Sequence, residues 1–171
     1  MKWIVLIGVV AGMRTMTPIA VLSWFVWLNR FQEPRWGAWV GLLPVVILLT
    51  VAALAEYVVD ILPQTPSRKE TPLVITRFVF GVLAGVLAWR GIGEPVVGGV
   101  LMALVGVPIG IYGGYRMRMA LARKFGRDWP AGLLESAMGL AVTLYGVDSL
   151  HWALIKPAVA LLHGLHCGVL S

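Results

Sequence analysis

The sequence has few charged residues, a single cysteine and no long polar stretch. Only 13% of the 171 residues are charged and 59% are hydrophobic, whereas soluble domains have about 25% charged residues. The apolar residues are spread along the whole chain, which leaves no segment polar enough for a second, soluble domain. The lone Cys167 excludes an internal disulfide. These features predict one polytopic transmembrane domain, residues 1–171.

The net charge of +6 does not indicate a nucleic-acid partner, because the basic residues lie mostly between apolar runs. This pattern orients membrane proteins, whose cytoplasmic loops are rich in lysine and arginine. One predicted side carries eight such residues and the other three, so both termini are expected in the cytoplasm. The eight are Lys2, Arg68, Lys69, Arg116, Arg118, Arg123, Lys124 and Arg127, and the three are Arg30, Arg35 and Arg90.

Hydropathy and turn signals predict an all-α bundle of about six membrane-spanning helices, since about 20 apolar residues cross a bilayer. The fifth and sixth spans are expected to form a tight hairpin near Asp148. The predicted spans are Trp3–Leu28, Gly37–Leu62, Pro72–Trp89, Val96–Met117, Pro130–Val147 and Leu150–Leu170.

Arg14 lies near the middle of the first predicted span. A charge at that depth costs about 2.5 to over 10 kcal/mol, so it is expected to face protein or water. The surrounding segment Gly12–Pro18 contains the glycine, threonines and proline that interrupt membrane helices. We therefore expect the first helix to be broken between Gly12 and Pro18.

A weak internal similarity suggests an inverted three-helix repeat, which is typical of transporters. Residues 11–14 (Ala-Gly-Met-Arg) resemble residues 113–116 (Gly-Gly-Tyr-Arg), and a span with a glutamate, Glu56 or Glu135, follows each copy. Three predicted spans separate the copies, so the two halves would have opposite orientations.

The predicted topology places ionisable groups of five spans in the cytoplasmic half of the bundle. Two readings stay open. The charges either form structural pairs that lock the helices, or they line a polar cavity. In the second reading Arg14 and the exposed amides of the helix break bind an anion, and Glu56 or Glu135 carries a proton. The candidate substrate-binding residues are Arg14, Thr15, Thr17, Glu56, Asp60, Arg77, Arg116 and Glu135.

At residues 11–18 (Ala-Gly-Met-Arg-Thr-Met-Thr-Pro) the chain resembles a bacterial integral-membrane family catalogued as domain of unknown function 4126. Residues 56–63 with 66–68, Arg77 with the following glycines, and residues 113–116 with 133–135 agree with the family's pattern. The chain has Ile61 and Ser136 where that family has a lysine and a second acidic residue. The resemblance implies a multi-span protein of the bacterial inner membrane. It does not indicate an activity.

The predicted function is a carrier or binding protein for a small solute or ion, with a cytoplasm-facing polar cavity. The alternative is a non-transporting scaffold or assembly subunit whose buried charges are structural. The sequence contains no Ser-His-Asp set, phosphate-binding glycine loop or metalloprotease signature, so neither an enzyme nor a cofactor or metal site is predicted. The expected partners are the lipid bilayer, a small anionic solute or a proton, and a second copy in a homodimer.

Overall fold

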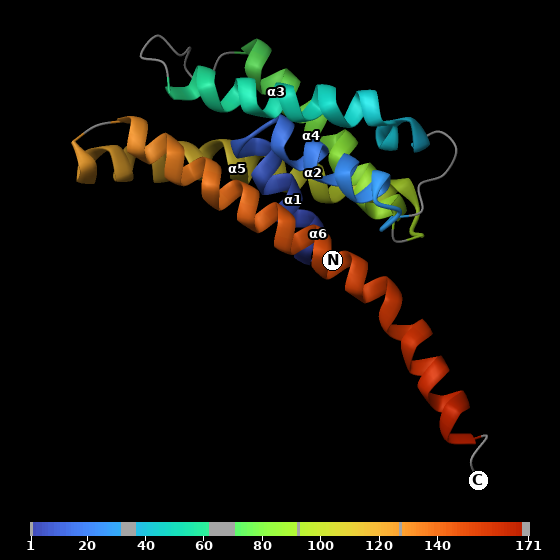
Figure 1. The fold of residues 1–171 in the computed structure, drawn as a ribbon. Helices are drawn as coiled ribbons and strands as arrows, with labels where there is room; N and C mark the ends of the chain where they lie inside the picture. The colour runs from blue at the N-terminus through green and yellow to red at the C-terminus, as the bar shows by residue number, and fades with distance from the viewer. Residues whose placement is uncertain (1, 32–36, 62–70, 92, 127, 169–171) are drawn as a thin grey trace.

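In a computed structural model the described part of the chain consists of helices (Figure 1). It covers residues 2–31, 37–61, 71–91, 93–126 and 128–168, and for residues 2, 4, 60–61, 71–73, 128 and 153–168 it gives the course of the backbone only. The predicted all-helical class is confirmed for these residues. The elements are α1 (Lys2–Met13), α2 (Met16–Trp27), the 3-10 helix η1 (Ala38–Gly41), α3 (Leu43–Ile61), α4 (Thr71–Gly91), α5 (Val96–Phe125) and α6 (Asp128–Gly168).

The first two helices form a V whose apex is Arg14–Thr15. The start of α1 contacts the middle of α6, and the apex contacts the start of α6. The end of α2 lies beside the middle of α6 again. The contacts that show this are Trp3 with Tyr145, Arg14 with Gly132, and Phe31, just after α2, with His151. The chain therefore enters the bundle, turns at the apex and returns toward the end at which it started.

The predicted single crossing from Trp3 to Leu28 is wrong for this reason. Each arm of the V has 12 residues and is about 18 Å long at about 1.5 Å per residue, while the hydrocarbon core of a bilayer is about 30 Å thick. Neither arm reaches across alone. The break that the sequence predicted between Gly12 and Pro18 contains the turn of this hairpin.

Glycines let α1 pack directly on the backbone of α5. A Cβ on Gly12 would lie 2.9 Å from the Cα of Gly110, and a Cβ on Gly106 would lie 2.9 Å from the Cα of Gly8. Side chains at these four positions would keep the helices apart, as in other membrane-helix contacts between small residues. The pairing of Gly8 with Gly106 and of Gly12 with Gly110 also shows that α1 and α5 run in the same direction.

This direction contradicts the inverted repeat. Residues 11–14 end α1 and residues 113–116 lie on α5, and the two helices run parallel. An inverted repeat requires its two copies to have opposite orientations, so this pair of segments does not carry one.

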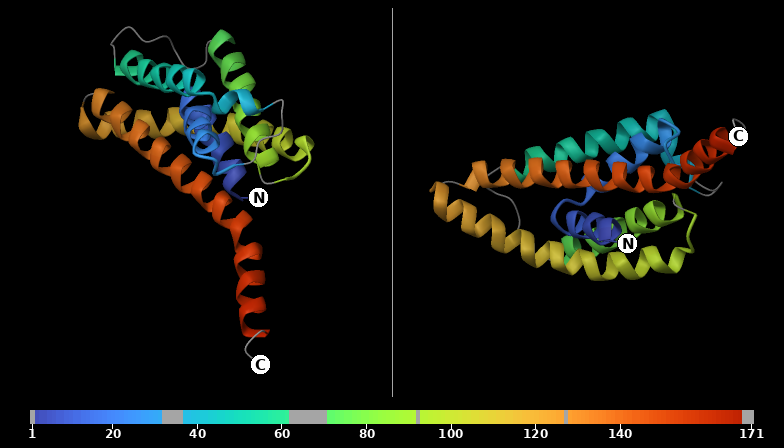
Figure 2. Two further views of the ribbon diagram at one scale, coloured as in Figure 1. Left: turned by 45° about the vertical axis from the view of Figure 1, so that its right-hand side comes forward. Right: turned by 90° about the horizontal axis from the view of Figure 1, so that it is seen from below.

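α6 is one continuous helix of 41 residues, so the predicted hairpin at Asp148 is wrong. Asp148 is exposed on the helix surface, and the segment Val147–Leu150 contains neither glycine nor proline to end a helix. A helix of this length extends about 60 Å, and its C-terminal part projects away from the other helices (Figures 1 and 2).

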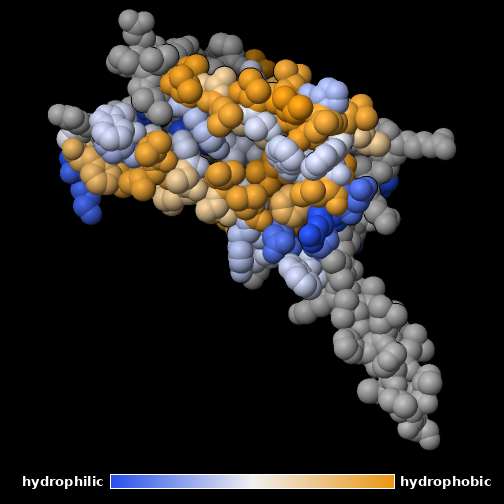
Figure 3. All heavy atoms as spheres, viewed as in Figure 1, coloured by the Kyte–Doolittle hydropathy of each residue, from blue (hydrophilic) through white to orange (hydrophobic). Residues whose placement is uncertain are grey.

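Among the residues whose side chains the structure describes, three helical segments are long and apolar enough to cross a membrane: Val74–Gly91, Val96–Phe125 and Trp129–Trp152. Met16–Trp27 is a shorter apolar helix, and Leu43–Val59 is a shorter apolar segment within α3. Large hydrophobic side chains also cover much of the coloured part of the face shown in Figure 3, whereas soluble monomers rarely expose such continuous apolar area. Leu48 (66% exposed), Val97 (66%) and Val58 (62%) are examples. These features are those of a membrane protein.

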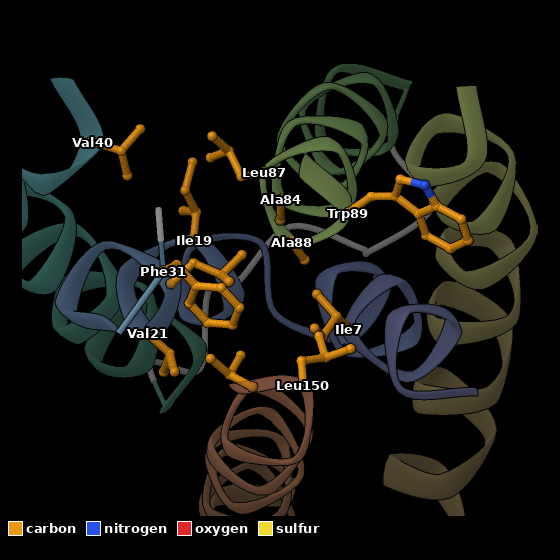
Figure 4. Close-up of a cluster of buried hydrophobic side chains, with 12 residues drawn as sticks. Ile7, Ile19, Val21, Phe31, Val40, Ala84, Leu87, Ala88, Trp89 and Leu150 are labelled. Atoms are coloured by element: carbon orange, nitrogen blue, oxygen red, sulfur yellow. The ribbon is translucent and has the colours of Figure 1, made fainter. Parts of the chain in front are cut away.

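Around the V the helices form two groups. α1 packs most extensively on α5 and α4, whereas α2 packs mainly on α3. Within the described residues α3 has extensive contacts with α2, α6 and η1 only. α6 contacts both groups, as the right-hand view of Figure 2 shows. A cluster of buried side chains between the arms, including Ile7, Ile19, Leu87 and Leu150, joins the groups at the end distant from the apex (Figure 4).

The two ends of the bundle also differ from the predicted orientation. Lys2 begins α1 at the end distant from the apex, because Trp3 lies beside Tyr145. Arg123 and Lys124 lie at the opposite end, in the last turn of α5. The sequence had placed all three basic residues on one side. The hairpin reverses the chain within the segment that was counted as one crossing, so Lys2 lies at the end of the bundle opposite to Arg123 and Lys124.

Candidate functional site

The carboxylate of Glu56 holds the start of α2. Its Oε1 accepts a hydrogen bond from the backbone N–H of Thr15 at 2.8 Å, and its Oε2 accepts one from that of Met16 at 2.9 Å. The side chain of Thr15 makes no capping bond to its own helix. A distant acid thus satisfies two amides that a helix leaves unpaired at its N-terminus, where a negative charge is also favoured. The break therefore presents a site that accepts an anionic group.

Arg14 lies beside this carboxylate cap, with only 1% of its surface exposed. Its Nη2 donates to the carbonyl oxygen of Gly132 on α6 at 3.1 Å. Its guanidinium carbon stands 5.3 Å from the ring centroid of Tyr57 on α3, close enough for a cation–π interaction. One buried cation thus contacts α3 and α6, the two helices that flank the apex.

Hydroxyl groups and a second acid complete the surroundings. The hydroxyl oxygens of Thr17 and Tyr57 are 2.8 Å apart and share a hydrogen bond. Glu135 on α6 is completely buried, and a Cβ on Gly114 would lie 3.3 Å from its Oε1, so this carboxylate packs directly on α5. The neighbouring Ser136 donates to the same Gly132 carbonyl that Arg14 uses, at 2.8 Å.

Arg77, on α4, lies at about the same height along the bundle as Arg14. It is 6% exposed and lies one turn before Gly81, which faces Ala11 of α1 and Val107 of α5. Residues four apart share a helix face, so Arg77 also faces the α1–α5 side, closer to the apex. Two cations and two acids thus lie at about the same height along the bundle. The cations come from the apex and α4, and the acids from α3 and α6.

The structure places the other predicted site residues differently. Thr15 and Thr17 are buried at the apex. Arg116 is exposed on the outer face of α5 and so lies outside the cluster of buried charges. The side chain of Asp60 lies outside the described residues. Tyr57 and the Gly132 carbonyl were not predicted. A tyrosine beside Glu56 in an apolar run was a usable signal, whereas no sequence signal marks a backbone carbonyl.

The cluster lies nearer one end of α4 and α6 than the mid-span depth that was predicted for Arg14. Gly132, which binds Arg14, is four residues from the start of α6, and Arg77 is six residues from the start of α4. Four to six residues correspond to about 6–9 Å. The buried charges therefore lie about one to two helical turns inside the apex end of these helices.

No family model, curated protein or solved structure matches the chain. The resemblance to the domain of unknown function 4126 therefore stays a prediction. Among the described residues, no group of three or more histidine, cysteine, aspartate or glutamate side chains is arranged to hold a metal ion. The chemistry that the site offers is that of its amides, guanidinium groups, hydroxyls and carboxylates.

Proposed function

We propose that the protein is a carrier of a small anion through the bacterial inner membrane, with its binding site at the apex of the V. The observation that supports this most is the Glu56 carboxylate on the amides of Thr15 and Met16. The apex already binds a carboxylate, and Arg14 supplies a buried positive charge next to it. Broken helices with polar ends are a common way to build a carrier site.

Glu56 couples the anion to a proton in this proposal. As a carboxylate it occupies both amides; when it takes up a proton it becomes a neutral carboxylic acid, and its hold on them weakens because bonds to charged groups are about twice as strong. The entering anion then accepts the two N–H groups, beside Arg14. When the anion leaves, Glu56 loses its proton and returns to the amides. One proton and one anion thus move together.

The two helix groups supply the movement. Within the described residues α3, which carries Glu56 and Tyr57, has its extensive contacts with α2, α6 and η1, so α3 can move relative to α1, α4 and α5. The basic residues in the last turn of α5, Arg123 and Lys124, favour a cytoplasmic location for the apex end. Release of Glu56 therefore opens the site toward the cytoplasm.

The alternative is a scaffold subunit in which these charges only lock the helices. The near-complete burial of Arg14 (1% exposed) and Glu135 (0%) favours it. The two functions differ in whether water and solutes ever reach the apex.

Thiol accessibility distinguishes them. Cys167→Ser provides a cysteine-free background, to which Thr17→Cys or Thr143→Cys is added. Both threonines are buried, 1% and 0% exposed, but Thr143 lies on α6 away from the apex and bonds only within its own helix, to Gly139. We expect a small charged methanethiosulfonate reagent to label position 17, and not position 143, in inside-out membrane vesicles. Equal protection of both positions would support the scaffold instead.

A further inference from the structure

One exposed face of α5 changes in character along its length. Residues spaced by three or four lie on this face: Val97, Leu101, Val105, Ile109, Tyr112, Arg116, Met119 and Arg123. The first four are aliphatic and 53–66% exposed, and Tyr112, the fifth, is 63% exposed. The charged part begins only with Arg116. An apolar, then aromatic, then cationic order matches the passage from hydrocarbon to headgroups at the surface of a bilayer.

The structure assigns this end of α5 as a binding surface for an anionic phospholipid. The aliphatic part of the face would contact acyl chains, Tyr112 the glycerol and ester level, and Arg116 and Arg123 the phosphate. Guanidinium groups bind phosphate with paired, charge-assisted hydrogen bonds. This inference does not depend on the carrier proposal, because Arg116 lies outside the cluster of buried charges.

Charge complementarity favours an anionic lipid over a zwitterionic one. Arg116, Arg123 and Lys124 are all exposed at this end, and Trp129, at the start of α6, is 51% exposed beside them. Among the described side chains, the acids at this end are Glu56 and Glu135, the first engaged by backbone amides and the second fully buried. Among the described side chains, therefore, no exposed acid at this end offsets the exposed positive charge.

Native mass spectrometry with added phosphatidylglycerol or phosphatidylcholine tests the assignment. We expect the wild type to bind phosphatidylglycerol preferentially, and Arg116→Gln with Arg123→Gln together to weaken that binding by about thirtyfold, since each of the two basic residues contributes about 1 kcal/mol near an anionic surface. Arg30→Gln is the matched control, because Arg30 is also exposed but follows α2 at the other end. It should keep the wild-type preference.

Three results would overturn the assignment: equal binding of both lipids by the wild type, an unchanged preference in the double variant, or an equal loss in Arg30→Gln. A variant with Arg116→Lys and Arg123→Lys should retain part of the preference, because lysine keeps the charge and loses the paired geometry. Both positions are exposed, so circular dichroism of all variants should match the wild type.

Discussion

Replacing Glu56 by glutamine is expected to abolish proton-coupled anion flux while the protein still folds. Glutamine keeps an oxygen that can accept one of the two bonds from Thr15 and Met16, but it takes up no proton at physiological pH. Its NH2 group also faces an amide N–H, so the cap loses one hydrogen bond and its charge, about 1.5–3 kcal/mol. Flux is measured in proteoliposomes through the lumenal pH as chloride, inorganic phosphate or succinate is added.

The matched control is Glu94→Gln, because Glu94 is exposed in the turn between α4 and α5, at the end distant from the apex. This variant should transport like the wild type. Wild-type flux in Glu56→Gln would exclude the proposed joint transport of a proton and an anion through the apex. Circular dichroism and a single peak in size-exclusion chromatography establish that both variants are folded.

Replacing Gly110 by alanine is expected to destabilise the bundle strongly. A Cβ at this position would overlap the carbonyl oxygen of Val9 and lie 2.9 Å from the Cα of Gly12, and both of these atoms belong to the backbone. α1 would have to move away from α5, and overpacking of this kind costs about 1–3 kcal/mol or more. The measurement is the midpoint of thermal unfolding in mild detergent.

Gly113→Ala is the control for this change. Gly113 lies on the same helix, three residues further on, and a Cβ there would have no heavy atom within 4 Å. Alanine is favoured over glycine inside a helix by about 1 kcal/mol, so this variant should melt at the wild-type temperature or above it. Equal midpoints for Gly110→Ala and Gly113→Ala would contradict the close contact of α1 with α5.

The sequence correctly predicted helices whose apolar segments are long enough to cross a bilayer once. The predicted spans at 72–89 and 96–117 correspond to α4 and the first part of α5. It failed at both ends of the chain. The run from Trp3 to Leu28 is long and apolar enough for one crossing, and only the packing of Gly8 and Gly12 on α5 shows that it folds back. Hydropathy reports length and polarity, and it carries no information on which backbones touch.

The site could also be predicted only in part, because the sequence shows which residues are charged and does not show what they contact. An arginine or glutamate in an apolar run must find a polar neighbour, which is why Arg14, Glu56, Arg77 and Glu135 were predicted as candidates. Their partners depend on tertiary structure. The amides that Glu56 caps become available only because the chain turns at the apex. The exposure of Arg116 was missed because a residue's position along a helix does not fix the face on which it lies.

The most direct test of the proposed binding site is native mass spectrometry of the wild type and Arg14→Gln in the presence of chloride, inorganic phosphate or succinate. Removing the buried guanidinium takes away the cation beside the apex amides, so the proposal predicts a bound anion in the wild type and none in the variant. Arg90→Gln, at the end distant from the apex, should bind like the wild type. The same ligand-free spectrum for all three proteins, or a stoichiometric second protein retained by all of them, would contradict the proposal and favour the scaffold.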